Sequence, residues 1–504
     1  MDLPELAVRL KPWRPRPRPA EAGPLVGGTG TGLRRDAVGG ADVLFQSVTA
    51  MAPAAAVVAS IPGGAPFAGG SLPLSVLLAL TASLLTASCL GELARHLPAA
   101  GSVATYAARG LHPAAGFLVA WGYVFAEALV PPLVLLQLGF TVAGTLHRQW
   151  AAYPAGLWWP WVLAGAAAVA AAGYRGIRAS ARLGTVLGAF EIAVLVVFAV
   201  LLIVRAGKDN TLSVFTPSHT APGESAVGGV LAGSVYCLLA FAGFEAAAPL
   251  AEEARRSRRT VRRAVVGAAL GVGALYVLTT YAMTVFHGPG RFAGFAANGD
   301  ASWDGVARGA FGLMWVPVFL AVVNSCVANA NAGASAATRT AYAFGRAGLF
   351  PRPLAAVHAR HRSPVTALAA QTVVTVVVAL ALGFVYGPVT AFYLIATGVV
   401  IVVVVVYIAA DLACAGYFLR NPGLRPVRHL LVPALASAVL VPALFTAAGL
   451  PVFSFVTPLE PPVSYAGAAV GAWLLLGTGV LLVLRRRYPE RLSGSAFEGV
   501  EMDR

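Results

Sequence analysis

The stretch YCLLAFAGFEAAAPLAEEARRSRRTVRR, residues 236–263, decides how the rest of the chain is interpreted. Its apolar run is interrupted by the small, flexible pair Ala242-Gly243, which a lone acid, Glu245, follows. The run resumes as far as Leu250, and two glutamates and six arginines come after it. Backbone freed from helical bonding at membrane depth is tolerated only where it lines a cavity or binds a ligand. Because a glutamate at the centre of a membrane helix costs roughly 2.5–3.5 kcal/mol on insertion, the pattern predicts a functional site in a broken membrane helix.

The composition of the chain is that of a membrane protein. Of its 504 residues, 58% are hydrophobic and 11% are charged, whereas soluble domains carry about a quarter charged residues. Long runs with few charges recur along most of the length, which predicts an all-α polytopic membrane protein. The four cysteines lie singly in apolar segments and are interpreted as small buried residues. The first forty residues lack the apolar core of a cleavable signal peptide.

Twelve apolar segments are predicted to cross the membrane. They are 38–60, 72–95, 113–144, 156–174, 181–204, 226–250, 264–286, 311–345, 364–386, 389–418, 430–448 and 463–484. The third, eighth and tenth are long enough to tilt or to extend past the bilayer. The predicted regions are a basic, proline-rich cytoplasmic tail over 1–37, a first repeat over 38–205, a second repeat over 226–419, two further spans over 430–484, and a cytoplasmic C-terminal tail over 485–504.

Arginine and lysine predict the orientation of the spans. With the N-terminus placed inside the cell, 31 of the 36 Lys and Arg residues fall on the inner side. The five others are Arg148, Arg205, Lys208, Arg291 and Arg308. A bias of this strength predicts a multi-pass protein of the cell membrane with both termini cytoplasmic. Since the basic residues gather at membrane edges, the net charge of +15 does not indicate a nucleic-acid surface.

A second interrupted helix is predicted near the start of the chain. In FQSVTAMAPAAAVVASI, residues 45–61, Pro53 lies in mid-span, where its ring and missing N–H break the helical ladder. Proline favours the first position of a helix. A half-helix starting there would present free N–H groups near 52–55 to an anion such as a substrate carboxylate; a simple proline kink is the alternative. The interrupted spans are the first and the sixth, which favours an inverted repeat with a transport site near the membrane midplane.

Three stretches resemble the amino acid–polyamine–organocation transporter family. AFAGFEAAAPLAEEARRSRRTVRRA, residues 240–264, resembles its sixth-helix signature. GELARHLPAAGSVATYAARG, residues 91–110, is similar to the end of its second helix. NANAGASAATRTAYAFGRAGLFPRPLAAVHARHRSPVTAL, residues 329–368, resembles its eighth helix and the loop that follows. The first break departs from the glycine-rich pattern of many members, because TAMAP stands at residues 49–53.

The resemblance implies a leucine-transporter-type fold, in which spans one to five and six to ten form a 5+5 inverted repeat with two appended helices. It also implies a substrate between the breaks of the first and sixth spans, with Phe241 or Phe244 closing over it as an aromatic gate. The basic stretch after Glu253 would then cover the cytoplasmic side. The implied contacts are Ala50, Met51, Ala52 and Ala54 with the substrate carboxylate, backbone carbonyls around Ala240, Phe241 and Ala242 with its amino group, and Phe244 and Glu245 beside them.

Several acids lie inside the predicted spans. Glu245 either carries a proton, binds a cationic ligand or is bonded to local backbone as a structural acid. Glu191 lies near the point where some proton-coupled relatives place a lysine; a carboxylate there either carries a proton, helps to hold a cation, or is hydrogen-bonded to a neighbouring helix. Glu127 and Asp411 either line the pathway or lie solvated near a helix end. Glu92 is interpreted as the structural partner of a loop arginine.

Polar residues also lie along the eighth span. Asn324, Asn331, Ser335 and Thr338 fall broadly on one helical face. One interpretation is interhelical hydrogen bonding, worth about 0.6–2 kcal/mol in membranes, and the other is one wall of a cation or substrate site. The candidate coupling residues are Glu191, Glu245, Ser335 and Thr338.

The predicted function is secondary active transport of an amino acid by alternating access, driven by protons. The alternatives are a polyamine or organic-cation carrier, an amino-acid exchanger and, from another class, a membrane sensor with a transporter fold. The sequence has neither clustered catalytic groups nor a Walker pattern, so an enzyme is not predicted. No metal or cofactor site is predicted, because His358 and His361 have no cysteine or carboxylate nearby. The expected partners are an amino acid or related amine, a proton or sodium ion, and the lipid bilayer, without nucleic acid.

Overall fold

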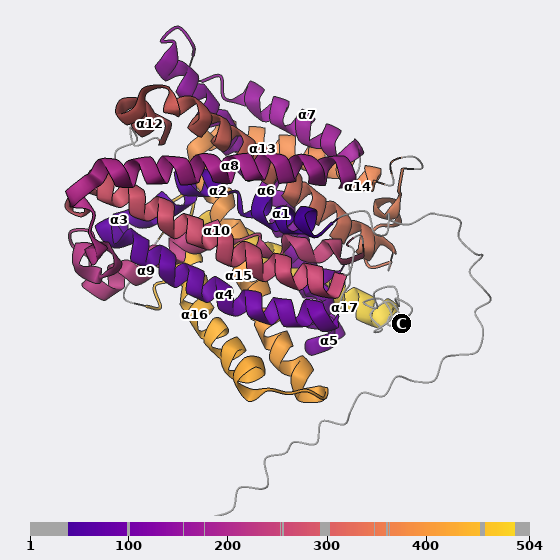
Figure 1. The fold of residues 1–504 in the computed structure, drawn as a ribbon. Helices are drawn as coiled ribbons and strands as arrows, with labels where there is room; N and C mark the ends of the chain where they lie inside the picture. The colour runs from indigo at the N-terminus through magenta and orange to yellow at the C-terminus, as the bar shows by residue number, and fades with distance from the viewer. Residues whose placement is uncertain are drawn as a thin grey trace, which may run out of the picture.

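The structure is a computed structural model, and it consists of a bundle of helices (Figure 1). The predicted N-terminal tail and the end of the predicted C-terminal tail, 489–504, lie outside the described residues. So do Glu253, Arg255 and Arg256 of the basic stretch. The residues that the structure describes are 39–97, 101–154, 156–175, 177–252, 254, 257–292, 303–346, 348–358, 361, 363–453 and 459–488.

The helices follow one another as the apolar segments predict. The first group is α1 (Gly40–Met51), α2 (Pro53–Ala55), the π-helical η1 (Ala56–Ser60), α3 (Ala65–Ala68), α4 (Leu72–His96), α5 (Ser102–Gly110), α6 (Pro113–Gln149), α7 (Trp159–Arg175) and α8 (Ile177–Ala206). The second group is α9 (Ala226–Phe241), the 3₁₀-helical η7 (Phe244–Glu252), α10 (Ser257–His287), α12 (Trp303–Phe311), α13 (Trp315–Arg346), α14 (Val365–Tyr386) and α15 (Pro388–Arg420). The π-helical η11 (Val427–Leu431), α16 (Val432–Ala447) and α17 (Tyr465–Arg487) come last.

Within the described residues, 10 helical stretches are long and apolar enough to cross a membrane. One of them, Gly40–His96, runs through both the first and the second predicted spans. The fourth predicted span corresponds to α7, which has 17 residues and is shorter than these stretches. The chain is therefore an all-helical polytopic membrane protein with about 10 to 12 candidate spans, as predicted.

The first predicted break is present. α1 ends at Met51, and Ala52 has φ 48° and ψ 65° before Pro53 begins α2. Left-handed backbone is uncommon for a residue with a Cβ, but the ring of the following proline disfavours helical backbone at the residue before it. The prediction that Pro53 is the first residue of a second half-helix is confirmed.

The second predicted break is present as well. α9 ends at Phe241, and Gly243 has φ 109° before η7 begins at Phe244. Glycine reaches such a φ at little cost because it has no Cβ. A Cβ at Gly243 would lie 2.6 Å from the carbonyl oxygen of Ala50, so the two breaks meet backbone against backbone.

A serine of α1 fastens the two breaks together. The Ser47 hydroxyl donates a hydrogen bond to the carbonyl oxygen of Phe244 at 2.6 Å and accepts one from the N–H of Ala247 at 3.1 Å. Ser47 is completely buried. Both bonds join residues about 200 positions apart, so they hold the start of the chain against the second break.

The remaining helices surround the breaks. α8, α10, α4 and α9 lie next to one another in that order, and α6 packs against both α13 and α15. Figure 1 shows α7 and α16 at opposite edges of the bundle, with α1 and α2 between them. The meeting point of the two breaks therefore lies inside the bundle.

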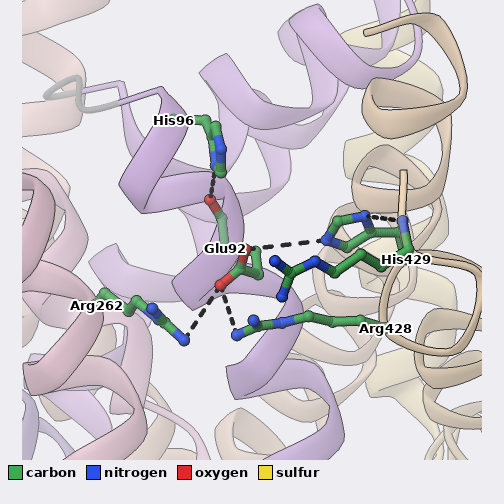
Figure 2. Close-up of polar contacts among 6 residues, drawn as sticks. Glu92, His96, Arg262, Arg428 and His429 are labelled. Atoms are coloured by element: carbon green, nitrogen blue, oxygen red, sulfur yellow. Dashed lines mark hydrogen bonds and ion pairs between the residues drawn. The ribbon is translucent and has the colours of Figure 1, made fainter. Parts of the chain in front are cut away.

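Three elements are joined at Glu92 near the end of α4. Its Oε1 lies 3.2 Å from Nη2 of Arg262 in α10 and 2.6 Å from Nη2 of Arg428 in η11. Nε2 of His429 lies 3.9 Å from Oε2. Figure 2 shows Arg262 on one side of the carboxylate and Arg428 with His429 on the other, while the His96 ring contacts the backbone oxygen of Glu92. The prediction that Glu92 has an arginine as its structural partner is confirmed, but both arginines lie in helices and not in a loop.

Candidate functional site

A cavity lies where the two breaks meet. Its walls come from the first break and η1, from α6, from the end of α9 and the second break, and from α13 and α15. The volume of the cavity is about 50 Å³. Of the residues predicted to contact a substrate, those that line it are Ala50, Met51, Ala52, Ala240, Ala242 and Glu245.

Three of the predicted residues lie behind the cavity wall. The side chains of Phe241 and Phe244 are completely buried. Phe241 packs edge-on against Tyr276 with 5.3 Å between ring centroids, and Phe244 lies 5.0 Å from the ring of Tyr407. Among the described residues that line the cavity, the aromatic one is Phe392 instead. Ala54 is the third residue outside the lining, and its N–H has a partner within the protein.

The backbone N–H groups after the first break are all engaged. The N–H of Ala54 donates to Oε1 of Glu191 at 2.6 Å, and the N–H of Ala55 donates to Oγ of Ser325 at 3.1 Å. On either side, the N–H of Ala52 bonds the Thr49 oxygen at 3.2 Å and that of residue 56 bonds the oxygen of residue 52 at 2.8 Å. Pro53, between them, has no N–H. The half-helix N-terminus thus donates to an acidic side chain, as its positive dipole end favours, and that side chain is Glu191.

Glu191 connects three elements. It lies on α8 with 1% of its surface exposed, and its two oxygens bind different helices. Oε1 accepts a hydrogen bond from the N–H of Ala54 in α2, and Oε2 accepts one from Nδ2 of Asn324 in α13 at 3.2 Å. Glu191 is not among the residues that line the cavity. It lies behind the cavity wall at the first break, where its hydrogen bonds join α8 to α2 and α13.

The polar residues of α13 separate into different environments. Asn324 binds Glu191 and the backbone oxygen of Leu187, so it joins α13 to α8. Asn329 lines the cavity. Ser335 accepts a hydrogen bond from the Arg339 side chain, and Thr338 donates to the oxygen of residue 334 in its own helix. Because a helix rises 1.5 Å per residue, Ser335 and Thr338 lie roughly 16–21 Å along α13 from Asn324, and the structure does not bring them to Glu191.

Glu245 lies at the second break and lines the cavity. Its Oε2 accepts a hydrogen bond from the N–H of Gly243 at 3.1 Å and another from the hydroxyl of Tyr407 in α15 at 2.6 Å. Glu245 therefore binds a backbone N–H group that the break has released from helical bonding, which is the structural role predicted for it. The same carboxyl is also open to the cavity, so the structural and ligand-binding interpretations are compatible.

A second acid shares the cavity with Glu245. Glu127 of α6 lines it and is 6% exposed. Gln137 of the same helix also lines it, and its Nε2 donates to the oxygen of Ala55 at 2.9 Å. Gln137 was not predicted, although it is an isolated amide in an apolar run that follows two prolines. Among the described residues that form the wall, no lysine, arginine or histidine accompanies the two carboxyl groups.

The chain is similar to known permeases and transporters. Residues 42–487 match the amino acid permease family, described as "Amino acid permease". Over 300 residues the chain is 28% identical to the low-affinity putrescine importer of Escherichia coli (strain K12), a match that covers 58% of this chain and 64% of the importer. Over 320 residues it is 25% identical to the branched-chain amino acid permease of Lactococcus lactis subsp. cremoris, covering 60% of this chain and 67% of the permease. Over 331 residues it is 27% identical to cationic amino acid transporter 4 of Mus musculus, covering 62% and 50%. The chain thus spans less than two thirds of the putrescine importer.

Proposed function

Because the chain belongs to the amino acid permease family, we propose that it is a secondary transporter that carries an organic amine across the cell membrane by alternating access. The cavity between the two breaks is the substrate site, and both termini lie inside the cell. The five-plus-five inverted repeat implied by the family resemblance supplies the two halves that would rock around this site.

The substrate of this proposal is a cation, either a polyamine or an amino acid with a cationic side chain. The observation that carries the proposal is the presence of Glu127 and Glu245 in the wall of one cavity. Two carboxyl groups in a poorly hydrated site favour a ligand of opposite charge, because an unpaired buried charge is costly. Relatives named as a putrescine importer and a cationic amino acid transporter agree with this substrate class.

A carrier of neutral amino acids is the second candidate. The half-helix at Pro53 favours it, since a helix N-terminus binds carboxylates well. Here, however, the N–H of Ala54 binds Glu191 and the N–H of Ala55 binds Ser325. A substrate carboxylate would have to displace Glu191, whereas a diamine leaves these bonds in place. This difference favours an amine without a carboxylate, such as a polyamine. Between a cationic and a neutral amino acid, Glu127 and Glu245 in the cavity wall favour the cationic one.

Protons provide the driving force in this proposal, and Glu191 is the coupling residue at the first break. Both of its oxygens accept hydrogen bonds from N–H donors, Ala54 on one and Asn324 on the other. A sodium ion would instead require oxygen ligands around it. Protonation would remove the negative charge that holds the half-helix N-terminus against α8 and α13, which would free the first break to move.

The test is uptake into proteoliposomes of labelled putrescine, arginine and leucine, each with and without an inward proton gradient and in the absence of sodium. We expect putrescine or arginine, and not leucine, to accumulate when the gradient is applied. Glu127→Gln and Glu245→Gln should each raise the KM for the cation by about tenfold or more, which corresponds to about 1.4 kcal/mol. Glu460→Gln, a change at an exposed acid, is the matched control and should leave KM unchanged.

Two results would contradict parts of this proposal. Accumulation of leucine alone would overturn the cationic substrate and favour displacement of Glu191 by a carboxylate. Accumulation of any substrate only when sodium is present would overturn proton coupling.

A further inference from the structure

A second, smaller cavity lies beside the first. It is bordered by α4, α9, α15 and α16, and its volume is about 10 Å³. That volume is close to what one water molecule needs. Hydroxyl-bearing residues line it, namely Ser83, Thr86 and Tyr407. The two cavities share the wall residues Leu239, Ala242 and Val403.

Each end of the smaller cavity leads to a carboxyl group. The hydroxyl of Tyr407 donates to Oε2 of Glu245 at 2.6 Å. The hydroxyl of Thr86 donates to Oδ2 of Asp411 at 3.1 Å. Asp411 follows Tyr407 by four positions in α15, so the two side chains lie on the same helical face. A polar chain therefore runs from the acid in the substrate cavity to a second acid deeper in the bundle.

Asp411 has an unusual environment for an acid. It is completely buried, and its Oδ1 has no hydrogen-bond partner in the described part of the chain. The ion pairs found among the described residues do not include it. Among the described residues, the Cys89 thiol lies within hydrogen-bonding range of this carboxyl and contacts the Cys414 thiol in turn, and Leu440 is what α16 contributes to the adjoining cavity. A buried carboxyl without a cation beside it favours the neutral form, which carries a proton.

We propose that Asp411 is a second proton-binding site, which exchanges a proton with Glu245 through Thr86, one water molecule in the smaller cavity and Tyr407. The proposal rests on the proposed function, because it concerns the acid that a cationic substrate neutralises. When the cation leaves, Glu245 would otherwise remain as a bare carboxylate in an emptied, poorly hydrated cavity. A proton supplied from Asp411 removes that charge.

The transfer is a concerted shift along the chain of hydroxyl groups. Asp411 gives its proton to the Thr86 oxygen, Thr86 gives its own proton to the water, the water gives one of its own to the Tyr407 oxygen, and Tyr407 gives its proton to Glu245. At each step one O–H bond breaks and one forms, so a single proton moves in total. Asp411 ends as a carboxylate and Glu245 as a neutral carboxyl. Binding of the next cation reverses the shift.

Asp411 would regain its proton from the side of the bundle that carries Glu92. Thr86 and Glu92 lie six residues apart on α4, which is about 9 Å along the helix. Asp411 thus lies between the substrate cavity and the face at which Glu92 contacts Arg262 and Arg428.

The experiment compares Asp411→Asn with the wild type in two transport assays. In exchange between preloaded proteoliposomes and labelled cation outside, we expect the variant to match the wild type within about twofold. In accumulation driven by a proton gradient, we expect a loss of at least about a hundredfold, the lower end of the range for removal of a proton-transfer group. Thr81→Val is a control and should alter neither assay, because Thr81 is an exposed threonine of α4, the helix that carries Thr86, and donates to the oxygen of Leu77 in its own helix.

Infrared difference spectra with and without substrate give a readout that a purely structural role for Asp411 would not produce. The wild type should have two carboxyl signals of opposite sign, one for Glu245 and one for Asp411, and Asp411→Asn should lack one of them. Thr86→Val should shift the Asp411 signal, because it removes the hydrogen bond to Oδ2. This second variant keeps the test decisive if Asp411→Asn does not fold.

The outcomes separate the relay from the proposed function. If the wild type accumulates substrate with the gradient and Asp411→Asn does so equally, with both carboxyl signals retained, the relay is wrong and proton coupling stands. If the wild type exchanges substrate but neither accumulates it with the gradient nor has a carboxyl signal, proton coupling is wrong and the relay fails with it.

Discussion

Gly243→Ala tests whether the contact between the two breaks is required. The added Cβ would lie 2.6 Å from the oxygen of Ala50, 2.7 Å from its carbonyl carbon and 3.0 Å from its Cβ. Two of these atoms are backbone, so no side-chain rotation relieves the contact. The φ of 109° at Gly243 adds strain for any residue with a side chain.

The expected cost follows from these two effects. Strained backbone at a residue with a Cβ costs about 1–3 kcal/mol, and overpacking of a filled interior costs about 1–3 kcal/mol. We therefore expect Gly243→Ala to lower the free energy of unfolding by about 2–6 kcal/mol, or to relieve the contact by separating the breaks and lose transport. Gly271→Ala is the control, because Gly271 is an exposed helical glycine with nothing within 4 Å of an added Cβ.

The protein offers its own reporters for the stability assay. Its four cysteines are free and buried, so a thiol-reactive fluorophore labels them only when the bundle opens. The apparent unfolding temperature of Gly243→Ala should fall well below those of the wild type and Gly271→Ala, at one fixed heating rate because such values depend on the rate. Wild-type unfolding temperature together with wild-type uptake in Gly243→Ala would refute the backbone contact between the breaks.

Two further changes test the first break. Ala52→Leu puts a bulky side chain into the cavity wall at a residue with left-handed backbone. It should abolish uptake of the labelled cation while the protein still elutes from size-exclusion chromatography as a monodisperse peak. Normal uptake would mean that the substrate binds elsewhere. Glu191→Leu leaves the N–H of Ala54 without its acceptor and should cost about 1–3 kcal/mol. Glu191→Gln keeps an acceptor oxygen and should retain most of that stability in the thiol assay while losing gradient-driven accumulation; equal stability of both variants would contradict the role of this bond.

The breaks themselves could be predicted from the sequence. A proline in mid-span at position 53 and a small pair at 242–243 act locally, through a missing N–H and a missing Cβ, so their effect does not depend on the rest of the fold. The long apolar runs predicted the helices for the same reason, because every backbone group in a membrane must bond within its own segment.

The partners across the bundle could not be predicted in this way. Which acceptor faces the N–H of Ala54, and which hydroxyl meets Glu245, depend on how α8 and α15 are rotated and tilted against the breaks. Helix packing sets those rotations, and the apolar pattern of a single span does not encode them. For the same reason Gln137 and Tyr407 were not singled out, although both contact the site.

The ion pair between Glu92 and Arg428 also bears on how much of the chain is needed. η11 and α16 belong to the part that the family resemblance treats as appended, yet Arg428 shares the carboxylate of Glu92 with Arg262, and Leu440 of α16 forms one wall of the smaller cavity. A chain shortened after Arg420 would retain every helix up to α15. Glu92 would then keep one arginine of two, and the smaller cavity would open toward the lipid. We therefore expect a working version of this sequence to include η11 and α16, and a related protein that ended earlier would need other groups in both places.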